Sequence, residues 1–487
     1  MQTALKSKKV VTPVIETLPA DLLTPLAVYL KLAANEENAF LLESVEGGES
    51  LARYSFIGAG AVMIVNGDDR KTIIRENGSA STVDLPLFEF LRKHFAERDL
   101  ENRSDIPSFV GGAIGFMNFS CAEWFEPSLT RDGQASTDAE ASFMIFRSIV
   151  AFDHARQSIQ IVTLIFEDVP MADENKEHQV SEAGKINHRI RTILEGGEIP
   201  LPGQPDLPVN DPASNWTKVE FETAVNEIKE LINAGEAYQV VLSQCFSKQT
   251  NATDVGIYRA IRSLNPSPYM FLLKFGERSI IGASPEMLVR SRGRDLEYRP
   301  IAGTRKRGNT REEDEHLAEE MRADKKEVAE HMMLVDLGRN DLGRVAEYGS
   351  VKVADLMSVE KYSHVQHLVS KLTAKLREDL DCFDALSACF PAGTVSGAPK
   401  VRAIEIIKKL EPTGRGVYAG AVGYFDYSGN MDTCIAIRTL VLENGKVTIQ
   451  AGAGIVADSV PSSEFDETVS KAAALIKAVE TAERGRV

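Results

Sequence analysis

The chain has 487 residues, more than the roughly 250 to 300 at which a single core stops growing, so two domains or one large one are expected. Hydrophobic residues make up 43% and charged residues 26%, a balance that excludes a disordered chain. The net charge of −16, with 55 Lys and Arg against 71 Asp and Glu, disfavours nucleic acid as a partner. A small anionic substrate would need local compensation by a metal ion or a few cationic groups.

The sequence carries no signal for export or for a membrane. No stretch approaches the roughly 20 apolar residues that cross a bilayer, and the first ten residues lack the apolar core of a signal peptide. The five cysteines are scattered without a C-x-x-C pair, which predicts neither a disulfide framework nor a zinc site. We therefore expect a cytoplasmic protein.

The first part of the chain is dominated by strand-like apolar runs. They cover residues 39–44, 54–65, 141–153 and 158–166. The segment 196–215 is rich in Pro, Gly, Asn and Asp without a hydrophobic period, which indicates a linker. It divides the chain into an N-terminal domain, residues 1–195, and a C-terminal domain, residues 216–487.

The second part opens with a predicted helix over 217–235. Thr217 and Glu220 have the spacing of a capping box, and Gly235 ends the apolar stripe. Charged helical patterns then alternate with strand-like runs at 238–246, 270–275, 279–284, 433–442 and 446–456. This mixture favours an α+β fold in which antiparallel sheets form a sandwich flanked by outer helices.

Two E-x-x-E pairs stand near the start of helical patterns. Glu327 and Glu330 form one pair, Glu464 and Glu467 the other, and the spacing places each pair on one helix face. Two such faces brought together would supply the carboxylate oxygens that Mg²⁺ prefers. Taken singly, such a pair is more often a solvated face or part of an ion pair, such as Glu467 with Lys471.

Several other residue patterns indicate anion binding. Turns that could present backbone amides to an anion occur at Gly303-Thr304, at Thr394 with 396–400, and at 451–454. Arg438 lies in an apolar run, where a guanidinium needs a carboxylate partner from the protein or from a substrate. His367, by itself, is more often a satisfied core histidine than a catalytic group. The residues alone thus suggest a Mg²⁺-dependent enzyme acting on a small carboxylate.

Seven sequence segments indicate a more specific class of enzyme. In chain order they are PIAGTR (300–305), KEVAEHMMLVDLGRND (326–341), HLVS (367–370), GTVSGAPKVRAIEII (393–407), YAGAVGYF (418–425), DTCIAIRT (432–439) and QAGAGIVADSVPSSEFDET (450–468). Together they closely resemble the chorismate-utilising enzymes, in particular the component I branch of anthranilate synthase. The resemblance covers nearly the whole chain. It implies a Mg²⁺-dependent chorismate-binding fold with an intertwined N-terminal regulatory part.

The resemblance also implies a role for each matching residue. Glu330 and Glu467 would be the main Mg²⁺ ligands, with Glu327 and Glu464 beside them. The expected catalytic residues are Glu286, His367 and Thr394. Of these, Glu286 would protonate the departing ring hydroxyl and His367 would assist the loss of pyruvate. The substrate would be held by Gly303, Thr304, Tyr418, Arg438, Lys471 and the backbone amides of Gly452, Ala453 and Gly454, with Arg438 taking the enolpyruvyl carboxylate.

Two positions report on the nucleophile. Relatives that add water carry a lysine base where this chain has Gln239, and relatives that make 4-amino-4-deoxychorismate carry a nucleophilic lysine where it has Ala302. The resemblance therefore implies attack by ammonia, giving 2-amino-2-deoxyisochorismate and then anthranilate and pyruvate, the first step of tryptophan biosynthesis. No cysteine stands in the G-x-C-x-G context of a glutaminase. Ammonia would come from a separate glutamine amidotransferase subunit, in an assembly of two copies of each chain.

A feedback site for L-tryptophan is also implied. It would be formed by Ser44, Pro268, Tyr269 and Met270, although these residues could instead pack one domain on the other. Three alternatives to the main hypothesis remain. The enzyme could stop at 2-amino-2-deoxyisochorismate, it could be an aminodeoxychorismate synthase component I, or the chain could be a silent tryptophan-binding regulator.

Overall fold

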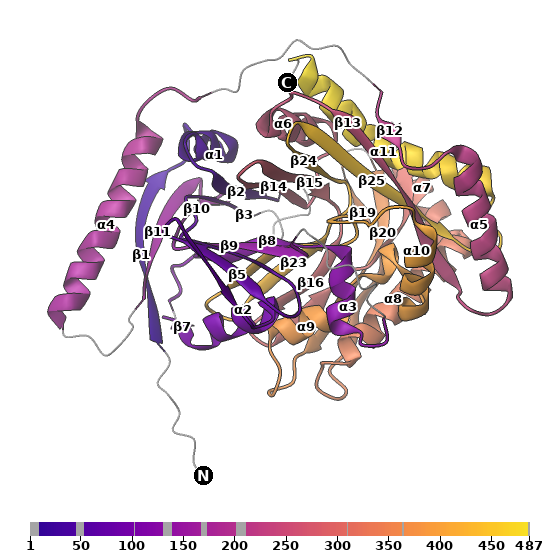
Figure 1. Ribbon diagram of the computed structural model, residues 1–487, viewed down its shortest axis with the longest axis horizontal. Helices are drawn as coiled ribbons and strands as arrows, with labels where there is room; N and C mark the ends of the chain where they lie inside the picture. The colour runs from indigo at the N-terminus through magenta and orange to yellow at the C-terminus, as the bar shows by residue number, and fades with distance from the viewer. Residues whose placement is uncertain are drawn as a thin grey trace.

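The computed structural model contains two large β-sheets with helices outside them (Figure 1). It describes residues 9–44, 53–101, 103–129, 139–166, 173–200, 211–308, 310–362 and 365–485, without the side chains of residues 173, 174, 304 and 326. Antiparallel pairing runs through both sheets, while β1 (Lys9–Pro19) and β7 (Arg98–Leu100) pair in parallel. The predicted α+β fold, with antiparallel sheets and outer helices, is confirmed.

The first sheet has 13 strands drawn from both parts of the chain. Their order is β12 (Ala213–Ser214), β13 (Gln239–Gln249), β25 (Lys446–Ile455), β24 (Thr439–Glu443), β15 (Arg278–Ser284), β14 (Tyr269–Phe275), β2 (Asn38–Glu43), β3 (Tyr54–Ala59), β10 (Ser148–Asp153), β11 (Ser158–Phe166), β1 and β7, with β21 (Gly397–Ala398) beside β13. The two parts meet where β14 pairs with β2.

The second sheet has 12 strands and also joins the two parts. Their order is β18 (Ile301–Lys306), β20 (Val365–Lys375), β17 (Asp295–Tyr298), β16 (Met287–Arg292), β23 (Met431–Ile435), β22 (Ala421–Asp426), β8 (Gly112–Met117), β9 (Ala141–Phe146), β4 (Met63–Gly67), β5 (Thr72–Glu76) and β6 (Ser79–Val83), with β19 (Lys352–Lys361) beside β20. Here β22 pairs with β8. The linker assigned to 196–215 lies partly outside the described residues, so the domain boundary stays a prediction.

Three apolar runs that were expected as single strands cross from one sheet to the other. The run 54–65 divides into β3 and β4, the run 141–153 into β9 and β10, and the run 433–442 into β23 and β24. Gly60 at φ +72° and Arg438 at φ +49° stand at two of the crossings. Because the apolar character continues across the crossing, hydrophobic periodicity does not reveal where a strand changes sheets. The prediction of single strands was therefore wrong at these three places.

Helices cover the outside of the sheets. They are α1 (Pro25–Ala33), α2 (Leu87–Ala96), α3 (Ala122–Phe125), α4 (Asp173–Glu195), α5 (Lys218–Asn233), α6 (Asp254–Leu264), α7 (Arg311–Ala323), α8 (Lys325–Gly343), α9 (Cys382–Cys389), α10 (Lys400–Leu410) and α11 (Pro461–Glu483). The predicted capping box exists, because Thr217 and Glu220 exchange both hydrogen bonds at the start of α5. No helix within the described ranges is long and apolar enough to cross a membrane.

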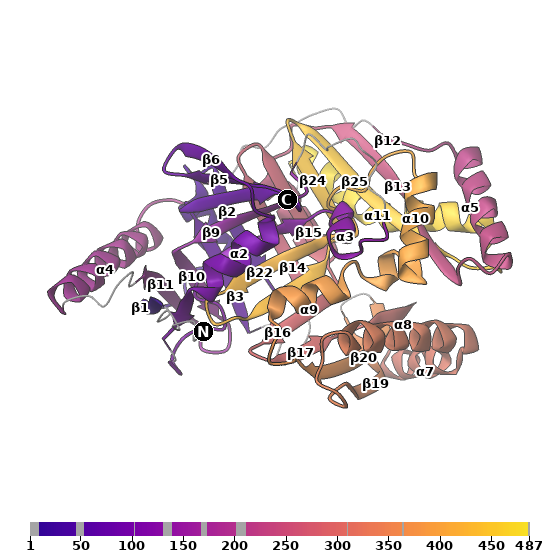
Figure 2. The same ribbon diagram turned by 60° about the horizontal axis from the view of Figure 1, so that its bottom comes forward.

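Two helices matter most for the site. Helix α11 packs along β25 and against α5 and α6, and it is the yellow helix at the upper right of Figure 1. Helix α8 packs against β18 and β20, and Figure 2 shows it beside α7 at the bottom of the molecule. These two helices carry the two predicted pairs of glutamates.

Candidate active site

A cavity of about 830 Å³ lies between α8, α11 and the strands β13, β18, β20 and β25. Its volume falls in the range usual for small-molecule sites. Most of the residues selected from the sequence line it, namely Glu286, His367, Thr394, Tyr418, Arg438, Gly452, Gly454, Lys471, Glu330, Glu464 and Glu467. Residues far apart in the chain thus converge on one site.

Glu286 stands in the connection from β15 to β16 and is buried at 5% exposure. Its backbone is held by Ile435, whose N–H donates to the Glu286 carbonyl at 3.0 Å. Burial raises the pKa of the Glu286 carboxyl to about 8, against smaller lowering effects of the Thr394 hydroxyl, the Ile301 backbone and Arg438. At neutral pH this carboxyl is therefore protonated and able to donate a proton into the cavity.

Thr394 belongs to a short 3₁₀ turn, Gly393–Val395. Its Oγ1 is buried and makes no hydrogen bond of normal length and angle to the residues that the structure describes, although it lies near enough to the Glu286 carboxyl to lower the pKa of that group. A buried hydroxyl without a well-formed hydrogen bond is costly, which indicates that a ligand or a water molecule completes the site. The turn reaches this position because Gly393 packs against α8, where an added Cβ would lie 1.6 Å from a Leu337 methyl carbon.

Arg438 lies between β23 and β24 in a left-handed backbone conformation, φ +49°. This conformation is uncommon for a residue other than glycine and is often found where a side chain must be aimed at a functional site. Within the described chain the guanidinium makes no ion pair. Burial lowers its pKa, and Glu286 and Tyr362 offset only part of this effect. A half-buried cation facing the cavity is thus available to a substrate anion.

His367 lies on β20, where it is 4% exposed. Its Nδ1 lies 3.1 Å from the Gly303 carbonyl oxygen, which can only accept, so Nδ1 carries the proton. Burial lowers the pKa of His367 to about 4, and Arg438 acts in the same direction. The imidazole is therefore neutral at pH 7, with Nε2 as the nitrogen that can accept a proton.

Two glycines of β25 allow polar side chains to reach the cavity. A Cβ on Gly452 would lie 2.8 Å from the Tyr418 hydroxyl, and one on Gly454 would lie 2.4 Å from Nε2 of Gln239. Lys471 reaches the same strand from α11, where its Nζ donates to the Gly452 carbonyl at 3.0 Å. The glycines are needed because the side chains above them occupy the space of a Cβ.

Two residues expected to bind substrate, Gly303 and Ala453, do not line the cavity, and a third, Thr304, is described for its backbone only. The Ala453 side chain is fully buried in the core, because alternation along β25 turns it away from Gly452 and Gly454. The expected contact of its backbone amide with substrate stays a prediction. Gly303 does not line the cavity, and its carbonyl supports His367 instead. The backbone of Thr304 pairs with His367, and its side chain lies outside the described part of the chain.

The four glutamates fit Mg²⁺ in donor type but are not gathered around one point. Glu330, Glu464 and Glu467 face the cavity, whereas Glu327 does not line it and pairs with Arg305 at 3.0 Å. Glu467 pairs with Lys471 at 2.7 Å. Among the described residues no three acidic, histidine or cysteine side chains lie close enough to hold a metal ion. Hard carboxylate oxygens on two facing helices nevertheless suit this cation.

A second cavity, of about 490 Å³, lies where the two parts of the chain meet. It is lined by all four residues expected to bind tryptophan: Ser44, Pro268, Tyr269 and Met270. The Ser44 hydroxyl is buried without a hydrogen-bond partner among the described residues. The cavity thus offers a buried hydroxyl that a ligand could use as a hydrogen-bonding group.

Sequence reasoning missed a charged cluster beside this second cavity. Arg290 and Asp432 form an ion pair at 2.7 Å, and the Tyr269 hydroxyl donates to Asp432 at 3.0 Å. The cluster joins β16, β23 and β14, which no local pattern brings together. The available signal was Arg290 itself, a guanidinium inside an apolar strand, the same feature that singled out Arg438.

Comparison with known proteins places this arrangement in a class. A family model described as chorismate binding enzyme matches residues 37–477. The anthranilate synthase component 1 of Acetivibrio thermocellus is 44% identical over 97% of this chain and 96% of its own length. The anthranilate synthase component 1 of Aquifex aeolicus is also 44% identical, over 98% of this chain and 96% of its own length. The chain therefore belongs to the chorismate-binding enzymes, in the family of anthranilate synthase component 1.

Solved structures agree with this assignment. Anthranilate synthase component I from Streptococcus pneumoniae superposes with a TM-score of 0.75 at 35% identity, covering 95% of this chain and 99% of the other. The menaquinone-specific isochorismate synthase of Escherichia coli superposes with a TM-score of 0.72 at 21% identity, covering 97% of this chain and 95% of the other. The second likeness concerns the fold alone.

Proposed function

We propose that this chain converts chorismate and ammonia into anthranilate, pyruvate and water, the first step of tryptophan biosynthesis. One observation carries the proposal: a protonated Glu286 and an Arg438 without an ion-pair partner in the described chain face the same cavity. Chorismate supplies what they need, a carboxylate for the guanidinium and a ring hydroxyl that leaves as water once it is protonated.

In the first half-reaction a bond forms between ammonia nitrogen and ring carbon C2. The ring double bonds shift, the bond to the ring hydroxyl breaks, and Glu286 gives its proton to that oxygen as it leaves. A proton is then lost from the added nitrogen, and the product is 2-amino-2-deoxyisochorismate. The high pKa of Glu286 suits this role, because the acid stays protonated until the hydroxyl begins to leave.

In the second half-reaction the proton on C2 is removed, the ether bond to the side chain breaks, and the ring becomes aromatic. The side chain departs as the enolate of pyruvate, whose methylene carbon then takes up a proton to give pyruvate. His367 is the group that would accept the C2 proton, because its Nδ1–H is held by Gly303 and its Nε2 is a base.

The identity of the nucleophile is supported by Ala302 and Gln239. Both line the cavity, and neither a methyl group nor a neutral amide can act as the lysine that relatives use for other nucleophiles. Ammonia therefore has access to C2 without competition from an activated water or a covalent adduct. We further propose that a glutamine amidotransferase subunit supplies it, in an assembly of two copies of each chain.

Mg²⁺ is proposed as the cofactor. Glu330 and Glu467 would hold it, with Glu464 and Glu327 nearby, and when bound it would neutralise the ring carboxylate of the substrate. The present partners of these residues, Lys471 for Glu467 and Arg305 for Glu327, would have to yield to the ion. Lys471 is then released to bind substrate, the role that the resemblance implies for it.

The proposal is tested by incubating the purified chain with chorismate, MgCl₂ and ammonium chloride at alkaline pH. We expect equal amounts of anthranilate, followed by its fluorescence, and pyruvate, followed by a coupled assay. Free ammonium replaces the partner subunit in this experiment. Loss of chorismate without pyruvate would favour an enzyme that stops at the amino intermediate, and binding of tryptophan without any turnover would favour a silent regulator.

We also propose that L-tryptophan binds in the second cavity and inhibits the reaction. The segment from β23 to Arg438 supports a connection, since Asp432 and Cys434 line the second cavity while Ile437 and Arg438 line the first. A ligand that prefers one arrangement of this segment would change the position of the substrate-binding guanidinium.

Replacing Ser44 by Ala should weaken inhibition by tryptophan. Loss of one hydrogen bond to a charged ligand group amounts to about 1.5–3 kcal/mol, or roughly a 10- to 150-fold higher inhibition constant. The measurement is the inhibition constant of the ammonium-dependent reaction, with kcat expected to be unchanged. Ser81→Ala, on the exposed strand β6, is the control, and tryptophan should inhibit this variant with the same inhibition constant as the wild type. An unchanged constant in the Ser44 variant would mean that tryptophan binds elsewhere.

A further inference from the structure

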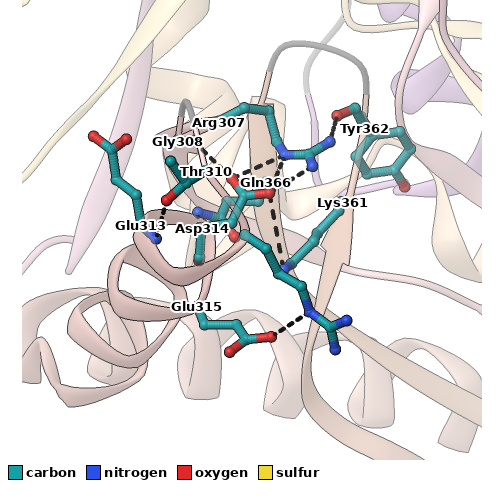
Figure 3. Close-up of polar contacts among 10 residues, drawn as sticks. Arg307, Gly308, Thr310, Glu313, Asp314, Glu315, Lys361, Tyr362 and Gln366 are labelled. Carbon is teal, nitrogen blue, oxygen red and sulfur yellow. Dashed lines mark hydrogen bonds and ion pairs between the residues drawn. The ribbon is translucent and has the colours of Figure 1, made fainter.

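An ion pair at the start of α7 ties together the segments that surround His367. Arg307 donates from Nε and Nη2 to Asp314 at 2.9 and 2.5 Å, and the Gly308 amide donates to the same carboxylate at 2.6 Å (Figure 3). Asp314 is only 4% exposed. These hydrogen bonds lower the pKa of Asp314 to about 2, and those from Arg307 have the largest effect. Asp314 is therefore ionised over the whole pH range in which an enzyme normally works. We refer to Arg307 and Asp314 as the α7 clasp.

The α7 clasp is joined to the hairpin formed by β19 and β20. Arg307 donates from Nη1 to the Tyr362 carbonyl at 2.6 Å, and the Gln366 side chain donates to the Asp314 carbonyl at 3.4 Å. Lys361 adds an ion pair to Asp314 at 3.9 Å (Figure 3). The hairpin end, the end of β18 and the first turn of α7 are therefore connected through Arg307 and Asp314.

His367 is supported from two sides by segments that the α7 clasp connects. The Tyr362 ring meets the imidazole edge to face, with ring centroids 5.6 Å apart at 62°. On the other side the Gly303 carbonyl accepts the hydrogen bond from Nδ1. Tyr362 is 9% exposed and Arg307 holds its backbone, while Gly303 lies on β18, the strand that leads into Arg307. The imidazole thus has little room to turn.

We propose that Arg307 and Asp314 are positioning residues for His367, acting through Tyr362 and Gly303. This inference rests on the proposed function, in which His367 serves the loss of pyruvate. Loosening the α7 clasp would let the imidazole move away from the C2 proton. Glu286 itself lies on the connection from β15 to β16, which the α7 clasp does not hold. Its carboxyl meets β18 only at Ile301, the end of that strand farther from Arg307, so the first half-reaction should be slowed much less than the second.

The test is Asp314→Asn, assayed with saturating chorismate, ammonium and MgCl₂. Chorismate loss and pyruvate release are followed together, and the amino intermediate is measured by chromatography. Because misplacing a catalytic group by about 1 Å costs up to roughly a hundredfold, we expect pyruvate release to fall roughly 10- to 100-fold. Chorismate loss should fall much less, so that 2-amino-2-deoxyisochorismate accumulates.

The control is Glu315→Gln, which breaks the exposed ion pair of Glu315 with Arg311 on the same helix. It should leave both rates unchanged, because exposed pairs contribute little. Tyr362→Leu leaves the ion pair intact, removes the ring beside His367, and should also accumulate the intermediate. It carries the test if Asp314→Asn does not fold, as judged by circular dichroism and thermal unfolding.

The outcomes separate the two proposals. The positioning role would be overturned if a folded Asp314→Asn or Tyr362→Leu variant lost chorismate consumption and pyruvate release equally. It would also be overturned if such a variant gave the same ratio of amino intermediate to anthranilate as the wild type. Absence of anthranilate from the wild-type reaction would instead overturn the proposed function. If the amino intermediate accumulates in the variants but not in the wild type, both the proposed function and the positioning role are supported.

Discussion

Replacing Glu286 by Gln should lower kcat for chorismate consumption by roughly 10²- to 10⁴-fold, the usual contribution of a general acid. Gln has nearly the same shape but no acidic proton, so substrate should still bind and KM should change little. The loss belongs to the first half-reaction. Chorismate loss and pyruvate release should therefore fall together, without the amino intermediate that is expected when the α7 clasp is loosened.

The pH dependence gives an independent measurement of the same group. The pKa of Glu286 is raised from 4.5 to about 8, so the proton needed for catalysis is present below pH 8 and is lost above it. At a constant concentration of NH₃, the wild-type rate should fall as the pH rises through about 8. For the same reason, the stability that the neutral carboxyl contributes is fully present below pH 4.5 and is lost as the pH rises through about 8. The thermal unfolding temperature of the wild type should thus decline relative to Glu286→Gln over this window.

Glu277→Gln, in the exposed turn between β14 and β15, is the control for both measurements and should match the wild type. A Glu286→Gln enzyme with a normal rate would assign the proton to another group. A pH profile with no alkaline limb at constant NH₃ would contradict the raised pKa.

Glu330→Gln and Glu467→Gln should each abolish activity that depends on Mg²⁺. Charge stabilisation by a metal ion amounts to several kcal/mol, which corresponds to roughly a thousandfold or more in rate. A neutral amide in place of either carboxylate removes half of the anionic charge that the two main ligands supply. The measurements are the rate as a function of MgCl₂ and the heat of Mg²⁺ binding in a calorimeter.

The matched control is Asp466→Asn, because Asp466 lies between the two glutamates of α11 and pairs with Lys218 at 3.3 Å. It is 69% exposed and should not affect Mg²⁺ binding. Glu327→Gln should weaken binding less than either main variant, since this carboxylate is engaged by Arg305. Normal calorimetric binding in both Glu330→Gln and Glu467→Gln would refute the proposed ligand assignment.

Much of the fold could be predicted from the sequence because it depends on local physics. The apolar stripe and capping box of α5 are set by residues three and four apart, and the helix forms where they predict it. Buried runs such as β14 and β15 were also apparent from their composition. Arg438 drew attention because an apolar surrounding does not tolerate an unpaired guanidinium.

What the sequence alone determined is the set of chemical groups: carboxylates spaced along helices, a histidine, an arginine, and an alanine and a glutamine where other nucleophiles would need lysine. Only the tertiary structure decided how each group behaves. Burial makes Glu286 a proton donor and keeps His367 neutral, and both effects come from segments distant in the chain. Long-range packing also decides where three strands cross between the sheets, how Gly303 supports His367, and how the α7 clasp forms. A local sequence pattern cannot predict these features, because the segments that bury a given residue are distant from it in the chain.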